Sequence, residues 1–165
     1  MKYLFIALLL FAGISRTNAQ QPADAANKML TAYYGLKNAL VADNTAEAKT
    51  QAKELLANIS TFPADKLDAA QLKNWNTYKE KLEFDSRHIS ETAAIAHQRE
   101  HFESLSKNMY QVVSALKLNN AAVYYQFCPM KKATWLSETA AIKNPYFGKQ
   151  MLTCGKTTET IPAKK

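Results

Sequence analysis

The chain has 165 residues, a formal net charge of +7 at pH 7 and 47% hydrophobic residues, which suits one compact domain with a single hydrophobic core. Its Lys and Arg residues are scattered and form no basic stripe with interleaved aromatic residues, so we expect no nucleic-acid partner. The sequence also lacks glycine-rich phosphate loops and the motifs of serine hydrolases and zinc proteases, so we expect no enzymatic activity.

Residues 1–19 carry the pattern of a secretory signal peptide. Lys2 precedes an apolar run from Tyr3 to Ile14, and small residues stand at Thr17 and Ala19. The apolar run is shorter than the about 20 residues that a membrane-spanning helix needs, so we expect no membrane span. No cysteine near the cleavage point could carry a lipid anchor. We therefore predict a periplasmic or secreted product with a single domain, residues 20–165.

Two helices are predicted at the start of this domain. Apolar residues recur at helical spacing from Pro22 to Val41. Asn44 followed by Glu47 resembles a capping box and predicts the start of a second helix. Pro63 ends that helix, and it stands where the first turn of a third helix would tolerate a proline.

The next stretch, from Asp65 to Leu118, contains neither glycine nor proline. A single helix of that length would measure about 80 Å, whereas a compact domain of this size has a radius of gyration of about 15 Å. We therefore predict a turn between Ser86 and Thr92, where Asp85, Ser86, Ser90 and Thr92 offer caps, and a fourth helix around Phe102. The predicted fold is all-α: an antiparallel four-helix bundle with a C-terminal extended or hairpin segment packed along it.

The C-terminal segment, residues 121–155, holds both cysteines and two of the five methionines. Residues 123–127 and 133–137 have the composition of two short strands. Residues 144–148, with the sequence N-P-Y-F-G, predict a turn that returns the following residues toward Cys128. The polar tail from Lys156 onward is expected to be loose.

Sulfur-containing side chains stand in pairs within this segment. Cys128 and Met130 are two residues apart, and Met151 and Cys154 are three residues apart. Thiolate and thioether ligands select Cu(I), and thiolates also bind Zn(II). Two cysteines in an exported protein also suit a disulfide, which for a loop of this length would stabilise the fold by about 3 kcal/mol. The residues themselves leave the metal site and the Cys128–Cys154 disulfide open.

Several motifs in this half of the chain resemble those of a known family. They are F-C-P-M, W-L-S, I-K-N-P-Y-F-G and M-L-T-C-G, preceded by H-Q-R-E-H-F-E-S-L-S-K-N-M-Y. The chain resembles a family of uncharacterised exported bacterial domains, which occur alone or fused to periplasmic adaptor subunits of heavy-metal efflux systems of the copper/silver type. The resemblance is densest from His97 to Thr160. It implies a helical periplasmic domain associated with metal handling, with an efflux adaptor or another periplasmic protein as partner.

Histidines supply further candidate ligands. His97 and His101 are four residues apart and share one face of the predicted fourth helix. An extended segment of ten residues spans about 33 Å, and the 21 residues from His97 to Leu118 span about 31 Å of helix. Cys128 should therefore return level with these histidines, near the end of the third helix, which carries His88.

These observations predict that Cys128, Met130 and a histidine bind one metal ion, Cu(I) in preference to Zn(II). We expect His97 or His101 to lie close enough to Cys128 to share the ion or a hydrogen bond with its thiol. The full set of predicted ligands is Cys128, Met130, Met151, Cys154, His97 and His101. The predicted function is a soft-metal-binding accessory protein of heavy-metal efflux or homeostasis. The alternative is a structural or protein-interaction domain that contains the Cys128–Cys154 disulfide and no metal.

Overall fold

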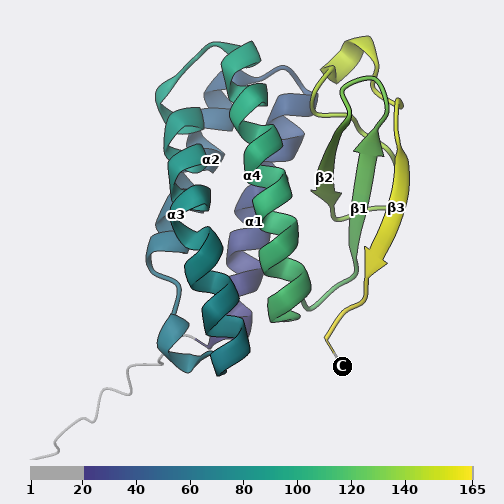
Figure 1. Ribbon diagram of the computed structural model, residues 1–165. Helices are drawn as coiled ribbons and strands as arrows, with labels where there is room; N and C mark the ends of the chain where they lie inside the picture. The colour runs from purple at the N-terminus through teal and green to yellow at the C-terminus, as the bar shows by residue number, and fades with distance from the viewer. Residues whose placement is uncertain (1–20, 165) are drawn as a thin grey trace, which may run out of the picture.

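The computed structural model describes residues 21–164, so the predicted signal peptide lies outside the described residues. The described part contains four helices followed by three strands (Figure 1). Their bounds are α1 Pro22–Val41, α2 Thr45–Ser60, α3 Ala69–Glu91, α4 Ile95–Leu116, β1 Val123–Cys128, β2 Ala133–Ser137 and β3 Lys156–Ile161. None of the helices in residues 21–164 is both long enough and apolar enough to cross a membrane.

The first two helices confirm the sequence prediction. α1 begins at Pro22, where a missing backbone N–H costs nothing because the first turn has no acceptor for it. The Asn44 side chain accepts a hydrogen bond from the backbone N–H of Glu47 at 3.0 Å and so caps α2. Both helices bury one apolar face, which includes Leu36 of α1 and Leu55 of α2.

The third helix begins and ends later than predicted. Pro63 precedes a short 3-10 turn, Ala64–Lys66, and α3 begins after Asp68, whose side chain forms a reciprocal capping box with Gln71. At the other end the chain turns at residues 92–94, beyond most of the predicted region. Ser86 and Ser90, predicted to offer caps, are instead buried inside α3. The helix continues because burial of its inward face outweighs the weak capping signal of these serines.

The four helices form a bundle in which α1 packs on α2, α2 on α3 and α3 on α4 (Figure 1). Aromatic pairs mark its core. Tyr33 of α1 stacks on Phe102 of α4 with ring centroids 5.3 Å apart, and Phe62 stacks on Trp75 of α3 at 4.2 Å. The predicted four-helix bundle is therefore confirmed.

The described residues are mostly helical, and the predicted C-terminal hairpin is present as β1 and β2, but the class is not purely all-α, because a third strand completes an antiparallel sheet with the order β2-β1-β3. The sheet lies beside the bundle, with β2 against α4 (Figure 1). The strands β1 and β2 match the two predicted strands to within one residue.

The tail predicted to be loose forms β3 and pairs with β1 from Val123↔Ile161 to Phe127↔Lys156. The side chains of β3 are exposed except for Ile161, which is why its composition is polar and suggested a loop. Its backbone forms hydrogen bonds with the edge of β1 that β2 does not occupy.

A buried hydroxyl joins the sheet to the bundle. Tyr33 is fully buried, its hydroxyl lies 2.6 Å from Ser106 Oγ of α4, and it accepts the backbone N–H of Leu136 of β2 at 3.1 Å. Burial raises the pKa of Tyr33 well above its ordinary value, so the phenol stays neutral at physiological pH. One side chain thus ties α1, α4 and β2 together.

Replacing this hydroxyl should be costly. Tyr33→Phe is expected to lower the free energy of unfolding by about 1–3 kcal/mol, because the N–H of Leu136 and the hydroxyl of Ser106 lose a buried partner. Urea unfolding of the variant measures the loss. Tyr34→Phe is the matched control, because the neighbouring hydroxyl makes no hydrogen bond to other residues in the range 21–164. Equal losses in the two variants would contradict this role of Tyr33.

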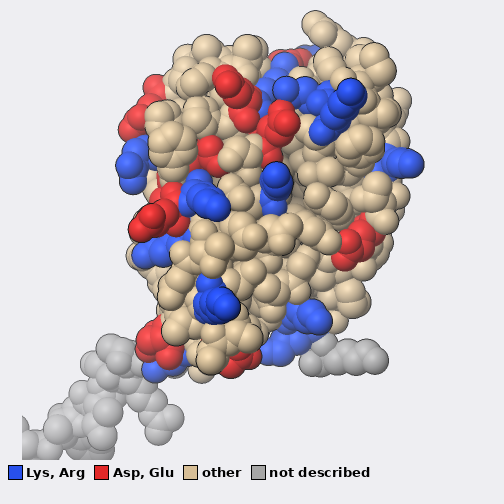
Figure 2. Space-filling model, viewed as in Figure 1, with Lys and Arg blue, Asp and Glu red and all other residues tan. Residues whose placement is uncertain are grey.

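Charged residues of both signs are interspersed on the face of the molecule drawn in Figure 2. Ion pairs join separate elements: Arg99 of α4 lies 2.6 Å from Asp43, and Lys131 lies 2.9 Å from Glu103 of α4. The second pair connects the turn after Cys128 to the bundle. No single-sign stripe crosses this face, which agrees with the scattered charges of the sequence.

Candidate metal centre

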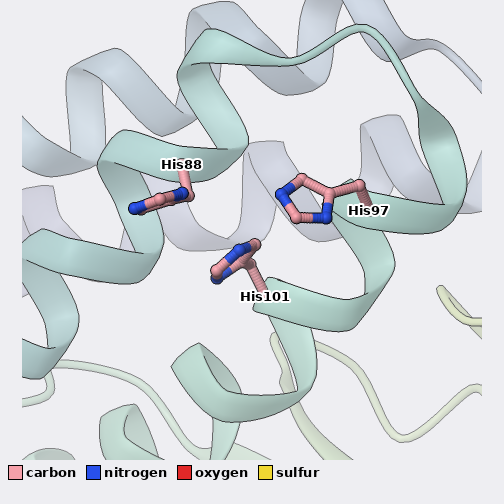
Figure 3. A group of neighbouring side chains, drawn as sticks. All are labelled: His88, His97 and His101. Carbon is pink, nitrogen blue, oxygen red and sulfur yellow. The ribbon is translucent and has the colours of Figure 1, made fainter.

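Three histidines meet at the end of the α3–α4 hairpin. His88 lies in the last turn of α3, and His97 and His101 lie in the first two turns of α4. The short connection at residues 92–94 folds α4 back on α3, so that each histidine presents a ring nitrogen within 4.8 Å of those of the other two (Figure 3). His88 is thus a full member of the cluster.

The rings are held by packing and by one buried carboxylate. His101 stacks on His88 with ring centroids 4.7 Å apart and meets His97 edge to face at 4.6 Å. His101 Nδ1 lies 2.9 Å from Asp85 Oδ1, and the Asp85 side chain is only 4% exposed. Phe84 covers His88, with ring centroids 4.2 Å apart.

The two cysteines form a second group at the end of the sheet. Cys128 closes β1 and is buried, Cys154 precedes β3 and is half-buried, and their Sγ atoms lie 3.9 Å apart with no disulfide between them. We call Cys128 and Cys154 the sulfur pair.

The predicted turn at residues 144–148 brings the sulfur pair together. The Asn144 side-chain oxygen accepts the backbone N–H groups of Tyr146 and Phe147, and its amide donates to the carbonyl of Cys154 at 2.7 Å. Gly148 has a φ of 53°, a conformation that a residue with a side chain adopts only with strain. The turn therefore returns the chain toward Cys128 as the sequence predicted.

Backbone groups surround the sulfur atoms. The N–H of Lys131 donates to Cys128 Sγ at 3.4 Å, in a tight turn in which Lys132 has a φ of 58°. The pKa of the Cys154 thiol is raised, first by desolvation and then by the neighbouring Cys128 thiol, while the Met130 backbone acts in the opposite direction. The raised pKa favours the protonated thiol of Cys154 at neutral pH.

The two predicted thioether ligands border the sulfur pair along the chain. Met130 is 66% exposed in the turn after Cys128. Met151 is half-buried, and its carbonyl accepts the N–H of Cys154 at 3.0 Å. An exposed, unbranched side chain such as Met130 can change rotamer to meet an ion.

The six predicted ligands fall into two groups on different sides of α4. Glu103, which pairs with Lys131, lies two residues after His101 and so about 160° around the helix from it. Glu103 is about 3 Å from His101 along the helix axis, so Lys131, in the turn after Cys128, contacts α4 near the level of the histidines. The predicted hydrogen bond between a histidine and Cys128 was wrong: among residues 21–164, Cys128 Sγ pairs with Cys154 and Lys131, and His101 pairs with Asp85.

Sequence reasoning placed Asp85 among possible helix caps and missed its contact with His101. A signal was present. Asp85 and His88 are three residues apart near the end of one helix, and His97 and His101 are four apart at the start of the next. Both spacings place side chains on one helix face, so a hairpin can bring the four together.

Comparison with known proteins identifies one match. Residues 16–121 match the model of a family described as protein of unknown function, DUF3347. This range includes the four helices and the three histidines and ends before β1 and the sulfur pair. No curated protein and no solved structure matches the chain. The expected membership of an uncharacterised family is confirmed: the chain belongs to the DUF3347 family.

Proposed function

We propose that this protein is an exported accessory protein that binds a soft metal ion, Cu(I) in preference to Zn(II), at the sulfur pair. The supporting observation is the 3.9 Å separation of Cys128 Sγ and Cys154 Sγ. Two thiolates at about 2.3 Å from one ion lie about 3.8 Å apart in tetrahedral geometry and about 4.0 Å apart in trigonal geometry. The two sulfurs need almost no movement to chelate one ion.

The surroundings of Cys128 support a thiolate. The backbone N–H of Lys131 points to its sulfur, and such donors stabilise the negative charge of a metal-bound thiolate. The buried position keeps water away from the bond to the metal. Met130 and Met151 can complete the coordination as thioethers, which bind Cu(I) well and contribute little to Zn(II).

The cellular role rests on two further lines of sequence reasoning. Export follows from the signal-peptide pattern of residues 1–19. The link to heavy-metal efflux or homeostasis, with an efflux adaptor or another periplasmic protein as partner, follows from the resemblance to domains fused to such adaptors.

The second candidate is a structural or protein-interaction domain in which the same two cysteines form a disulfide. The short sulfur separation favours this function as well, because the thiols can be oxidised with little backbone movement. In this function the disulfide would fasten the 144–155 segment to β1 and the protein would need no metal.

A competition titration tests the metal proposal. The reduced mature protein should remove one Cu(I) from a chromophoric chelator, and Cys128→Ser should lower the Cu(I) affinity by at least about 100-fold, because it removes an anionic soft ligand. Met130→Leu should weaken Cu(I) binding while leaving Zn(II) binding unchanged. Met109→Leu, a fully buried methionine of the α4 core, is the matched control and should change neither.

Mass spectrometry of the periplasmic protein, isolated without reductant, separates the two candidates. A metal-bound or metal-competent dithiol supports the metal proposal. A quantitative loss of two hydrogens, together with no Cu(I) uptake at micromolar concentrations after reduction, contradicts it and leaves the interaction domain.

A further inference from the structure

We propose that His88, His97 and His101 form a second metal site, separate from the sulfur pair, that binds a borderline divalent transition-metal ion such as Zn(II). All three ligands are imidazoles, which suit Zn(II), Cu(II) and Ni(II), whereas the thiols of the sulfur pair suit Cu(I). The two sites therefore differ in ligand chemistry as well as in place. This proposal does not depend on metal binding at the sulfur pair.

The distances between the ring nitrogens are close to those of a three-histidine site. Three nitrogens at about 2.0–2.1 Å from a tetrahedral ion lie about 3.4 Å apart. The ligand atoms of the cluster lie within 4.8 Å of one another, so the widest pair has to approach by no more than about 1.4 Å. Small rotations of the exposed His97 ring provide this movement, since its side chain is 45% exposed.

Asp85 orients one ligand in the way that metal sites require. With Nδ1 of His101 donating to the buried carboxylate at 2.9 Å, its Nε2 is left with a free lone pair for an ion. This pairing of carboxylate, histidine and metal fixes the tautomer and raises the basicity of the ligand. His97 makes a similar contact with a carboxylate, because its Nδ1 lies 3.4 Å from Glu100 Oε2. This contact is longer and more exposed than that between His101 and Asp85.

The cluster is covered on one side and open on the other. Phe84 packs on His88 and lies 5.7 Å from the His101 ring, while it remains 51% exposed itself. The His101 side chain is 15% exposed, and the His97 side chain is 45% exposed. Three protein ligands with a solvent-facing side leave a fourth position for water or for a partner's ligand, which favours an exchangeable ion over a permanent structural one.

An ion at this site would connect two helices. His88 belongs to α3, and His97 and His101 belong to α4, so the three ligands come together only when the hairpin is folded. Binding to the folded state alone raises the melting temperature by mass action. For a domain of this size the expected rise is roughly 5–10 °C at 100-fold excess of free ion over Kd.

Zn(II) and Co(II) titrations of tag-free mature protein test the site. The experiment uses the wild-type chain and a Cys128→Ser/Cys154→Ser variant, which has no thiol left to bind metal. We expect the variant to bind one Zn(II) and to show the rise in melting temperature given in the preceding paragraph. Its Co(II) form should show ligand-field bands typical of low coordination number and no sulfur-to-cobalt charge-transfer band.

Substitutions in the same background assign the ligands. His88→Gln, His97→Gln and His101→Gln should each lower Zn(II) affinity by at least about 10-fold, and Asp85→Asn by about 10- to 100-fold as expected for an orienting residue. Glu80→Gln, an exposed carboxylate of α3 two turns before His88, is the matched control and should leave the affinity unchanged. Circular dichroism verifies that each variant keeps its helical content.

Three results would overturn the proposal. One is no Zn(II) binding by folded protein, and another is Zn(II) binding that survives all three histidine substitutions. The third is Zn(II) binding by the wild-type chain that disappears in the cysteine variant, because the ion would then belong to the sulfur pair. If the cysteine variant does not fold, NMR resonances of the histidine rings in the wild-type protein distinguish the two sites instead. The proposal requires the resonances of all three histidines to shift on addition of one equivalent of Zn(II).

Discussion

Trp135→Ala is expected to lower the free energy of unfolding by about 3–5 kcal/mol and to weaken Cu(I) binding at the sulfur pair. Trp135 of β2 is fully buried and meets Tyr146 edge to face with ring centroids 6.0 Å apart. The ring also lies against the chain just after Cys154: a Cβ at Gly155 would come within 2.9 Å of it. Removing the ring leaves a cavity between β2 and the loop that positions Cys154.

Trp75→Ala is the matched control, because Trp75 is equally buried but lies in α3, stacked on Phe62. Urea unfolding should show losses of similar size for the two variants. Only Trp135→Ala should also reduce Cu(I) affinity, measured by chelator competition under conditions in which both proteins remain folded. Equal Cu(I) affinity in the two variants would mean that Trp135 supports the fold without positioning the sulfur pair.

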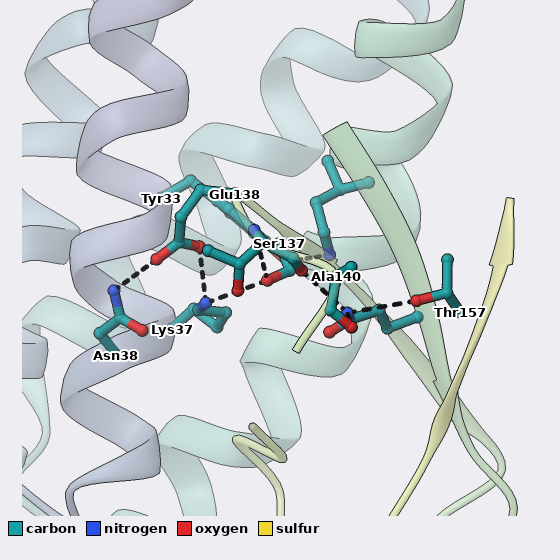
Figure 4. A network of polar contacts seen from close by, with 10 residues as sticks. Tyr33, Lys37, Asn38, Ser137, Glu138, Ala140 and Thr157 are labelled. Carbon is teal, nitrogen blue, oxygen red and sulfur yellow. Dashed lines mark hydrogen bonds and ion pairs between the residues drawn. The ribbon is translucent and has the colours of Figure 1, made fainter. Parts of the chain in front are cut away.

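Glu138→Ala is expected to be the most harmful substitution of a partly exposed residue. Lys37 of α1 is buried, and its Nζ lies 2.6 Å from Glu138 Oε2, while Asn38 donates to the other carboxylate oxygen at 2.9 Å (Figure 4). Without Glu138 the Lys37 ammonium stays in the core with only Ser137 Oγ, at 3.4 Å, as a partner. Leaving a buried charge unpaired costs about 3–5 kcal/mol.

Lys37→Met should cost far less, under about 1 kcal/mol, because the Glu138 side chain is 35% exposed and water can solvate it. The double variant Lys37→Met/Glu138→Ala should recover most of the stability that Glu138→Ala loses. A double-mutant cycle from urea unfolding measures this coupling. Additive losses would contradict the pairing.

The same pair predicts how stability depends on pH. Burial raises the pKa of Glu138, but the hydrogen bonds from Lys37 and Asn38 outweigh it, so the pKa lies below the ordinary carboxyl value of 4.5. At a pH above the ordinary carboxyl pKa, the depressed pKa of Glu138 stabilises the folded state. This stabilisation is lost as the pH falls through the pKa of Glu138 in the folded protein. Burial lowers the pKa of Lys37, which changes stability only toward alkaline pH. Wild-type protein should therefore lose stability more steeply below about pH 4.5 than the double variant.

Local chemistry alone determined the helices, two strands and the turn that returns the chain to Cys128. The apolar spacing of residues 22–41, the Asn44 cap and the composition of residues 133–137 each act over a few neighbouring residues. The N-P-Y-F-G turn likewise depends on one asparagine side chain and one glycine conformation. Such features form in much the same way wherever the segment is placed in a fold, so a sequence reveals them.

The tertiary structure alone decided where α3 ends, that β3 exists, and which side of α4 each group of ligands occupies. β3 forms because β1 offers a free edge; its β-branched threonines and Ile161 suit a strand, but they do not show with which strand it pairs. Helix α4 is polar on two sides, with His97 and His101 on one and Glu103 on the other. Both sides satisfy the same helical periodicity, so local pattern cannot choose between them. Packing makes the choice: α3 brings His88 and Asp85 to the first side, and β2 packs on α4 where Lys131 of the sulfur-bearing turn pairs with Glu103 on the second.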